Sequence, residues 1–462
     1  MKEIHLLKQT AKSLMSGMTL ATTDPHRPAW HLAPPVGLLN DPNGFIQFEG
    51  RYHLFYQWNP LACAHGAKFW GHWSSEDLVH WCHEAPALIP SEEYEANGCY
   101  SGSAVNNNGV LTLIYTGNVK FGGGRTAWQC LAEMNDQYEF TKLGPVLGLP
   151  AGYTGHVRDP KVWEHDGEWW MVLGAQDIAL HGKTLLFRSP DLHVWSFVNE
   201  IAGSGLNGLP AFGYMWECPD LFHIADQDIL IVCPQGLESE GIRYLNLLQS
   251  GYFCGTLNYD TGGYQHGEFH ELDLGFDFYA PQTMCSEDGR RLLFGWMGMA
   301  DNDEFSQPTV EYGWIHTMTC PRELSWESGK LYQRPVKELQ SLRTDRRDFN
   351  NIASQLPKLT TETAEFMITG EGQFNLNFAD ILHLKCDEQG ITLMRTHPEG
   401  TRYWKGKVSS VQILCDRSSV EIFINDGESV MSSRYFPSGE PFAKFAGDAF
   451  LEVTIWRLKK MC

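Results

Sequence analysis

Val110-Leu-Thr-Leu-Ile-Tyr115 has the apolar, β-branched composition of a buried β-strand, and four similar runs occur elsewhere in the chain. They are Tyr52-His-Leu-Phe-Tyr56, Trp169-Trp-Met-Val-Leu173, Asp228-Ile-Leu-Ile-Val232 and Arg291-Leu-Leu-Phe-Gly-Trp296. The five runs begin about 60 residues apart, with no long helical periodicity between them. This spacing is typical of four-stranded modules repeated around an axis. It predicts a five-bladed β-propeller, with an array of β-sandwiches as the alternative.

Internal repeats support the propeller. Ser74-Ser-Glu-Asp-Leu-Val-His-Trp81 resembles Arg188-Ser-Pro-Asp-Leu-His-Val-Trp195, because each has Asp-Leu followed by Trp three residues later. Turns with an acid before proline are also expected at Asn40-Asp-Pro42, Arg158-Asp-Pro160 and Glu217-Cys-Pro219. Similar turn motifs in successive modules are expected of a repeat architecture.

The composition of the chain changes at both ends of this region. Residues 336–354 are polar and predict a linker, and alternating segments closed by the hairpin signal Asn425-Asp-Gly427 predict a β-sandwich over 355–462. At the other end, residues 1–26 form a predicted helical extension whose apolar contact face comprises Ile4, Leu7, Ala11, Leu14 and Met18. The propeller itself is expected over residues 27–335.

The overall composition indicates the fold class and limits which kinds of partner the protein can bind. Of the 462 residues, 13% are aromatic, and 45 Gly and 23 Pro accompany them, which favours an all-β protein. The net charge of −21 repels phosphate backbones and argues against nucleic acid as a partner. No apolar run reaches the ~18 residues of a membrane span. The 12 cysteines include no CxxC pair, and no export signal is recognised, so a cytoplasmic location is expected. The oligomeric state stays open.

Three acids stand in unusual surroundings. Asp41 lies between apolar residues and a strand, Asp159 follows Arg158, and Glu217 follows Trp216. An apolar wall such as Trp216 would favour the protonated form of Glu217. A protonated acid beside an ionised carboxylate is the pair that glycoside hydrolysis requires. For Asp41 and Asp159 taken singly, a turn residue and a salt-bridge partner remain the alternatives.

Ordered motifs over about residues 27–462 identify the chain as similar to glycoside hydrolase family 32, the β-fructofuranosidases. The motifs are Leu39-Asn-Asp-Pro-Asn-Gly44, Phe55-Tyr-Gln57, Trp70-Gly-His72, Tyr100-Ser-Gly-Ser103, Arg158-Asp-Pro160, Glu217-Cys-Pro219, Phe278-Tyr-Ala-Pro-Gln282, Gly295-Trp-Met297 and Ser418-Ser-Val-Glu-Ile-Phe-Ile-Asn-Asp-Gly427. The resemblance implies a five-bladed propeller followed by a β-sandwich, in agreement with the strand pattern. It implies no metal and no organic cofactor.

The resemblance also implies residue roles. Asp41 would be the nucleophile, Glu217 the acid/base and Asp159 the transition-state stabiliser, with Arg158 keeping Asp159 ionised. A retaining enzyme of this kind has its two catalytic carboxyl groups about 5–5.5 Å apart. The fructose pocket would be formed by Asn40, Gln57, Trp70, Tyr100, Ser101, Arg158, Tyr279 and Trp296. The chain departs from the family at Leu38-Leu39, where Trp-Met is usual, and at His65, where Trp is common.

The expected reaction is hydrolysis of the β-fructofuranosyl bond of sucrose 6-phosphate, sucrose or both, because the chain is most similar to bacterial members that act on the phosphorylated sugar. Alternatives are a fructosyltransferase or fructan hydrolase of the same family and, from another class, a non-catalytic sugar-binding propeller. A phosphorylated substrate needs a local basic site in so acidic a protein. Candidate phosphate contacts are His65, Lys120, Arg125 and Lys183, three of them on expected Gly-rich turns.

Overall fold

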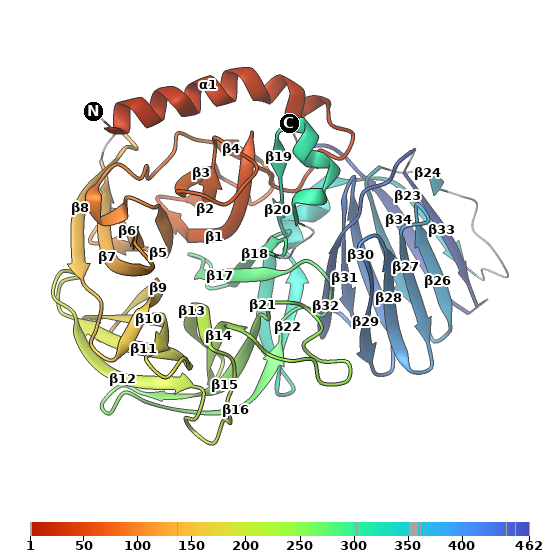
Figure 1. Cartoon of the computed structure of the whole chain (residues 1–462). Helices are drawn as coiled ribbons and strands as arrows, with labels where there is room; N and C mark the ends of the chain where they lie inside the picture. Colours follow the sequence, from red (N-terminus) through yellow and green to blue (C-terminus); the bar gives the residue numbers. More distant parts are fainter. Residues whose placement is uncertain are drawn as a thin grey trace.

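The structure, a computed structural model, describes residues 2–135, 137–300, 304–350, 359–360, 362–439, 441–448 and 450–461. Strands dominate the described residues, and the exceptions are α1 (Lys2–Thr23) and the short 3-10 helices η1 (Glu93–Glu95), η2 (Glu304–Ser306), η3 (Pro308–Tyr312) and η4 (Lys337–Leu342). Figure 1 shows a ring of small sheets with a two-layer sandwich beside it and α1 along the outer edge of the ring. The protein is therefore all-β, with a five-bladed propeller followed by a β-sandwich.

Each blade is a small antiparallel sheet formed mainly by consecutive strands. Blade 1 contains β1 (Gly37–Phe48), β2 (Arg51–Asn59), β3 (Phe69–Ser75) and β4 (Trp81–His83). Blade 2 contains β5 (Cys99–Asn107), β6 (Val110–Phe121), β7 (Gly124–Met134) and β8 (Phe140–Leu147). Blade 3 contains β9 (Tyr153–His165), β10 (Glu168–Asp177), β11 (Gly182–Ser189) and β12 (Ser196–Gly203).

Blades 4 and 5 complete the ring. Blade 4 contains β13 (Met215–Ile224), β14 (Gln227–Gln235), β15 (Gly251–Asn258) and β16 (Gly263–Glu271). Blade 5 contains β17 (Tyr279–Cys285), β18 (Arg291–Met297), β20 (Thr317–Met318), β21 (Arg322–Glu327) and β22 (Lys330–Pro335). Strand β19 (Trp314–Ile315) returns to pair in parallel with β1, so a segment from blade 5 closes the ring on blade 1.

The five apolar runs that predicted the propeller lie in the second strands of the five blades, β2, β6, β10, β14 and β18. The first strands, β1, β5, β9, β13 and β17, contact one another in a closed circle around the axis. Buried hydrophobic clusters fill the spaces between successive blades. This arrangement confirms the predicted five-bladed propeller and excludes the array of sandwiches.

Two six-stranded sheets form the sandwich, and their inner faces share one hydrophobic core. One sheet contains β23 (Arg343–Asn350), β34 (Glu452–Leu458), β25 (Ala364–Thr369), β30 (Ser410–Asp416), β31 (Ser419–Ile424) and β32 (Ser429–Arg434). The other contains β24 (Leu359–Thr360), β33 (Phe442–Gly447), β26 (Phe374–Phe378), β27 (Leu382–Asp387), β28 (Gly390–Thr396) and β29 (Glu399–Lys405). Strand β23 falls within the predicted linker and pairs with β34, and residues 351–354 of that linker lie outside the described residues.

The segments with an acid before proline, expected to be turns, lie inside the first strands of blades 1, 3 and 4. Pairing with the second strand is interrupted there by a bulge at residues 40–41, 159–160 and 218–219, and similar irregularities occur at Ser101 and at residues 280–281. Proline cannot donate a hydrogen bond to the neighbouring strand, so the ladder breaks beside it. Asp159, Cys218 and Ala280, each before a proline, have positive φ angles of 66°, 48° and 48°. Five bulges at one level therefore redirect side chains toward the axis.

Helix α1 packs through a different face from the one predicted. Thr10 and Ala21 are buried, and Leu6 and Leu14 pack against the core beneath the helix. The predicted face is wrong because, of its five residues, only Leu14 makes this contact; Ile4, Leu7, Ala11 and Met18 are exposed. An added Cβ on Gly17 would lie 2.8 Å from Val36, so Gly17 lies on the docked face, where the helix closely approaches the chain beneath it.

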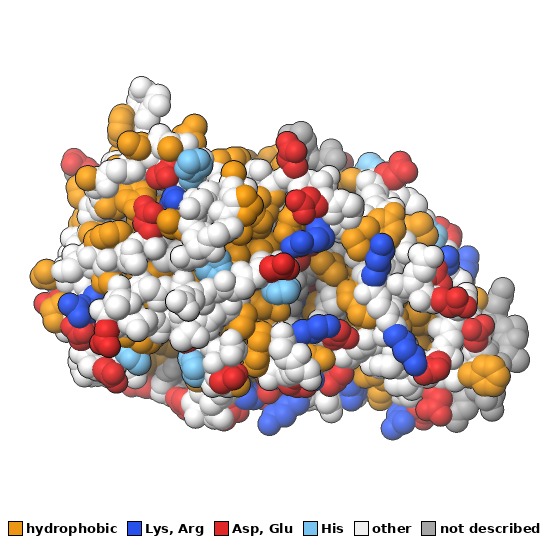
Figure 2. All heavy atoms as spheres, turned by 90° about the horizontal axis from the view of Figure 1, so that it is seen from below, with side chains coloured by type: hydrophobic (Ala, Val, Ile, Leu, Met, Phe, Trp, Pro, Cys, Tyr) orange, Lys and Arg blue, Asp and Glu red, His pale blue; other side chains and the backbone are white. Residues whose placement is uncertain are grey.

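Acidic side chains are spread over the face of the molecule in Figure 2, on both the propeller and the sandwich, in keeping with the net charge of −21. Within the part of the chain that the structure describes, no helix is long and apolar enough to cross a membrane.

Candidate active site

The three predicted acids meet where the bulged inner strands surround the propeller axis. Asp41 lies on β1, Asp159 on β9 and Glu217 on β13. The thiol of Cys218 lies between two of them, with Sγ 3.8 Å from Oδ2 of Asp41 and 3.7 Å from Oδ2 of Asp159. Arg158 links the other pair, because it contacts Glu217 and lies 3.9 Å from Asp159. The structure therefore brings all three carboxylates into one cluster.

Asp41 is held by two side chains from its own blade and the next. Ser101 donates a hydrogen bond of 2.6 Å to Oδ2, and the amide of Asn40 donates one of 2.9 Å to Oδ1. The amide oxygen of Asn40 in turn accepts a bond of 2.7 Å from Lys68, whose ammonium is buried. Burial lowers the pKa of Lys68 to about 7, although Asp41 and Glu304 oppose the shift. These contacts fix the orientation of the Asp41 carboxylate.

Glu217 accepts hydrogen bonds from three different strands. Arg158 donates to Oε1 at 2.5 and 3.1 Å, while Gln235 and Tyr279 donate to Oε2 at 2.5 and 2.6 Å. Burial opposes ionisation of Glu217, but these donors outweigh it and lower its pKa. The carboxylate is therefore held in one position by a complete set of donors.

One expectation about the electrostatics was wrong, and a second holds only in part. Trp216 does not form a wall for Glu217, because neighbouring side chains on a strand point to opposite faces. Its ring stacks on Phe253 in the core between blades 3 and 4, and its Nε1 donates to the carbonyl of Phe212. Arg158 was expected to keep Asp159 ionised. It lies 3.9 Å from Asp159 and lowers the pKa of that acid, but burial outweighs it, and its hydrogen bonds go to Glu217.

Asp159 is the acid on which a proton is most favoured. Burial raises its pKa to about 7; Arg158 opposes the shift, whereas Glu217 and Asp41 add to it. The backbone N–H of Cys218 donates to Oδ2 of Asp159 at 2.9 Å. Because interacting carboxylates titrate as a unit, this proton belongs to the whole cluster. The site therefore retains one exchangeable proton on the acid side of neutrality.

Most residues of the predicted fructose pocket lie around this cluster, but three of them lie behind it. Asn40, Ser101, Arg158 and Tyr279 contact the carboxylates directly, as described above, and Tyr100 is next to Ser101 on β5. In contrast, Gln57 donates to the carbonyl of Cys99, and the buried indole of Trp70 donates to the carbonyl of Tyr100. Trp296 is also buried and packs edge to face against Tyr279. Direct sugar contact is therefore wrong for the indoles of Trp70 and Trp296, which support neighbouring residues.

The four candidate phosphate contacts divide into two groups. Lys183 is buried, donates to the carbonyl of Ser204, and lies within 4.0 Å of Asp177 and 3.8 Å of Glu200. His65 contacts Glu304 at 3.1 Å and Lys68 at 3.1 Å. Lys183 is therefore committed to internal partners and was wrong as a phosphate contact, whereas His65 is exposed and stays a prediction. Lys120 and Arg125 lie on paired strands beside the site, at the ends of β6 and β7 and not in the turn between them.

Sequence reasoning missed three contacts of the cluster. Gln235 binds Glu217 from the end of β14, Lys68 reaches Asn40 from the loop before β3, and His156 accepts a hydrogen bond of 3.0 Å from Arg158. None of them lies in a recognised motif. The one available signal was Lys68, a charged residue directly before the apolar Phe69-Trp70.

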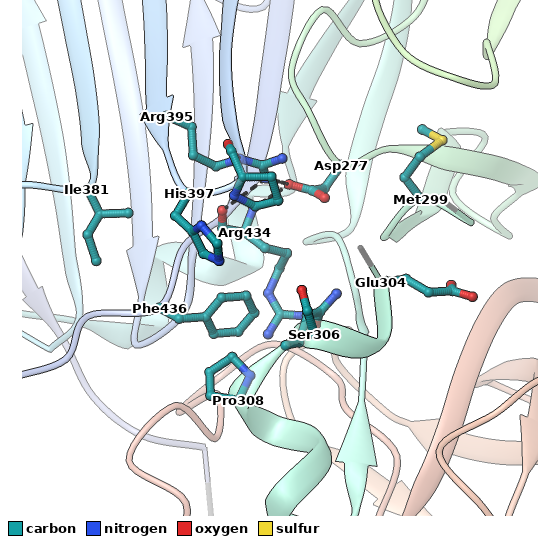
Figure 3. A pocket seen from close by; sticks show the side chains of 12 residues that line it. Asp277, Met299, Glu304, Ser306, Pro308, Ile381, Arg395, His397, Arg434 and Phe436 are labelled. Atoms are coloured by element: carbon teal, nitrogen blue, oxygen red, sulfur yellow. Dashed lines mark hydrogen bonds and ion pairs between the residues drawn. The ribbon is translucent and has the colours of Figure 1, made fainter. Parts of the chain in front are cut away.

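A cavity of about 230 Å³ lies between the propeller and the sandwich (Figure 3). On its sandwich side, Arg395 forms an ion pair of 2.6 Å with Asp277. On its propeller side, Glu304 contacts His65 and His316. Since His65 contacts Lys68, the cavity wall is connected through side chains to the surroundings of Asp41. Among the described residues, no group of three or more His, Cys, Asp or Glu side chains is arranged to hold a metal ion.

The first strands of this propeller carry a cluster of carboxylates, one of them fixed by an arginine. Paired carboxylates are the catalytic groups of glycoside hydrolases. Residues 31–335 match the Glycosyl hydrolases family 32 N-terminal domain, and residues 389–457 match the Glycosyl hydrolases family 32 C-terminal domain. The chain therefore belongs to glycosyl hydrolase family 32.

Individual relatives agree with this assignment. The chain is 56% identical to a sucrose-6-phosphate hydrolase of Salmonella typhimurium, over 95% of each sequence. The solved structure of a sucrose-6-phosphate hydrolase from Lactobacillus gasseri superposes with a TM-score of 0.90 at 31% identity, covering 98% of this chain and 97% of that one. A mutant of a Bombyx mori β-fructofuranosidase, solved in complex with sucrose, has a TM-score of 0.89 at 34% identity, covering 100% and 99%. The chain is an enzyme of this hydrolase family.

Proposed function

We propose that this enzyme hydrolyses the β-fructofuranosyl bond of sucrose 6-phosphate and of sucrose with retention of configuration. The observation that supports the proposal most directly is the cluster of Asp41, Asp159 and Glu217 around the propeller axis, held by Ser101, Cys218 and Arg158. The relatives named sucrose-6-phosphate hydrolase and the sucrose complex of the Bombyx mori enzyme support the substrate class.

In the proposed reaction the carboxylate of Asp41 attacks the anomeric carbon of the fructosyl ring, and Glu217 gives a proton to the departing glycosidic oxygen. Water then attacks the fructosyl-enzyme ester, and Glu217 takes back a proton from it. Asn40 and Ser101 orient the nucleophile, while Arg158, Gln235 and Tyr279 hold Glu217. Asp159 accepts hydrogen bonds from fructosyl hydroxyls. The proton shared by the cluster supplies the acid for the first step.

Azide trapping with p-nitrophenyl β-D-fructofuranoside tests these roles, because this leaving group departs without an acid. Asp41→Ala and Glu217→Ala are each expected to lower kcat on sucrose at least about a thousandfold. With azide, Glu217→Ala yields the β-fructosyl azide, since azide opens the ester that Asp41 forms. Asp41→Ala yields the α-azide by direct displacement.

The control is Asp191→Ala, an exposed acid on a hairpin turn far from the axis. It should keep wild-type kcat. The same azide anomer from both active-site variants would refute the role of Asp41. Equal release of glucose and fructose from sucrose distinguishes the hydrolase from a fructosyltransferase, which would release excess glucose.

The cysteines support a cytoplasmic location for this activity. All eleven cysteines that the structure describes carry free thiols, which is typical of proteins kept in a reducing compartment.

A further inference from the structure

The rim of the site beside Glu217 carries an excess of positive charge. Arg125 and Lys120 face each other on the paired strands β7 and β6. Arg125 donates to Nδ1 of His156 at 3.2 Å, and Arg158 donates to the same atom at 3.0 Å. We use the name basic rim for Lys120, Arg125 and His156. In a chain with a net charge of −21, such a cluster calls for an explanation.

The two outer cations of the basic rim have no carboxylate partner among the described residues. Arg125 contacts His156 and stacks over the ring of Tyr100, with 5.8 Å between its guanidinium carbon and the ring centroid. Lys120 is exposed, and its side-chain ammonium has no hydrogen bond or ion pair with any described residue. Arg158 by contrast is paired with Glu217. Two cationic side chains are therefore available to an external anion.

His156 is neutral, and its Nε2–H adds a hydrogen-bond donor beside Arg125. Because both arginines can only donate, its Nδ1 is the acceptor and its proton lies on Nε2. Burial lowers the pKa of His156 to about 4; Arg158, Arg125 and Lys120 add to this shift, and Glu217 opposes it. Arg158, Arg125 and Lys120 thus all favour the neutral form of the His156 ring.

The backbone is shaped to hold Arg125 there. An added Cβ on Gly155 would lie 2.1 Å from the carbonyl oxygen of Arg125 and 2.6 Å from its Cγ, so only glycine allows β9 to approach β7 this closely. The guanidinium is thereby packed between Tyr100 and His156, which reduces the conformational entropy lost when a ligand binds.

The position of the basic rim indicates which part of a substrate it meets. The acid/base must face the oxygen of the leaving group, so the side of the site near Glu217 is the leaving-group side. One residue, Arg158, bridges His156 and Glu217, because it donates hydrogen bonds to both of them. The basic rim therefore lies on the leaving-group side, whereas Asn40 and Lys68 lie behind the nucleophile.

We propose that the basic rim binds the phosphate group of a sugar 6-phosphate leaving group, with Arg125 as the main contact and Lys120 and His156 completing the site. This inference rests on the proposed hydrolysis of β-fructofuranosides. A guanidinium matches two phosphate oxygens at once, and the exposed ammonium adds a point charge. The cavity in Figure 3 is a poorer anion site, because Arg395 is paired with Asp277 and the guanidinium of Arg434 donates to Ser418.

The test compares kcat/KM for sucrose 6-phosphate and sucrose in the wild type and in Arg125→Gln, Lys120→Gln and Arg188→Gln. Arg188 is a matched control, since it is an exposed arginine of blade 3 that pairs with Glu168 away from the axis. The ratio of the two kcat/KM values is expected to exceed ten in the wild type. It falls at least tenfold in Arg125→Gln and severalfold in Lys120→Gln, and it is unchanged in Arg188→Gln. A tenfold fall corresponds to about 1.4 kcal/mol.

Competitive inhibition gives a second measurement, which does not require the enzyme to cleave a phosphorylated sugar. Glucose 6-phosphate is expected to inhibit sucrose hydrolysis by the wild type more strongly than glucose does, and this difference shrinks as salt screens the charges. Lys120→Gln, an exposed change, keeps the test valid if Arg125→Gln does not fold.

An equal ratio in wild type, Arg125→Gln and Lys120→Gln would overturn the inference, and so would an equal fall in the Arg188→Gln control. In those cases cleavage of sucrose would still stand. If the wild type releases fructose from neither sugar, the proposed function itself fails.

Discussion

At the scale of single residues, Arg158 decides how charge is distributed among the three carboxylates. It donates two hydrogen bonds to Glu217. Asp159 instead accepts a hydrogen bond from the backbone N–H of Cys218 and has two acids as neighbours. Arg158 lowers the pKa of both acids, so the pKa of Glu217 is lowered, but burial outweighs Arg158 at Asp159 and raises that pKa to about 7. One proton and one firmly held carboxylate are therefore found in the same small space.

Replacing this arginine should change the pH profile. The wild type is expected to lose activity as the pH rises through about 7, where the cluster gives up its proton. Arg158 favours the ionised forms of both Glu217 and Asp159, so Arg158→Met raises their pKa values. The alkaline limb of kcat/KM for sucrose should therefore move to higher pH, by about one unit or more, while the maximum falls.

Trp216→Phe is the control for this experiment. Trp216 packs between blades 3 and 4, so this change should leave the alkaline limb in place. A limb that moves in Trp216→Phe and stays in Arg158→Met would show that the indole, not the guanidinium, sets the proton affinity.

Motifs could predict which acids matter but not which partners they have. Asp41, Asp159 and Glu217 stand in recognisable segments, and the bulges bring all three to the axis. The contacts that hold them come partly from other blades, such as Tyr279 on β17 for Glu217 and Ser101 on β5 for Asp41. Such pairings depend on how blades meet in space, which one strand's sequence does not contain.

At the scale of elements, the repeated segments were a reliable guide. In Ser74–Trp81 and Arg188–Trp195 the aspartate accepts a backbone bond two residues on, and the tryptophan Nε1 donates to the leucine carbonyl three residues earlier, at 2.9 and 2.8 Å. The same sequence therefore builds the same hairpin in blades 1 and 3. The bulges were not predicted, because an acid before proline is equally compatible with a turn.

Helix α1 supports a prediction about its true contact face. Ala21 is 1% exposed and Met15 is 85% exposed on the same helix. A carboxylate at position 21 would be buried without a partner, so Ala21→Asp should lower the free energy of unfolding by about 1–3 kcal/mol. Met15→Asp should change it by less than about 0.5 kcal/mol. Urea denaturation of both variants measures this, and equal losses would mean that the helix docks through another face.

At the scale of the whole molecule, a buried network of charges joins the propeller to the sandwich. His31, before blade 1, contacts Asp416 at 3.0 Å and Glu421 at 2.9 Å on the sandwich. Arg322 of blade 5 binds Glu421 at 2.6 Å and Asp273 at 3.1 Å. These side chains are completely buried, so each charge depends on the others for compensation. The network fixes the sandwich against blades 1 and 5.

Protonation of His31 should make the stability of this junction depend on pH. Burial opposes its charged form, but Asp416 and Glu421 outweigh burial and raise its pKa above the ordinary 6.5. A raised histidine pKa gives stability that is complete below 6.5 and is lost as the pH rises through the folded-state value. The pKa of Glu421 is lowered to about 2, so its contribution is present above its ordinary 4.5 and is lost as the pH falls toward 2.

The junction should therefore be most stable between pH 4.5 and 6.5. His31→Gln should lower the free energy of unfolding at pH 6 by about 3–5 kcal/mol, because it leaves the buried Asp416 without its cation and Glu421 with Arg322 alone. The loss should shrink as the pH rises above 6.5 and the wild-type histidine itself gives up its proton. Urea midpoints across this range, with the exposed His193→Gln as control, measure the difference. A loss that is the same at pH 6 and pH 9 would mean that His31 stabilises the junction by packing and hydrogen bonding alone, without its charge.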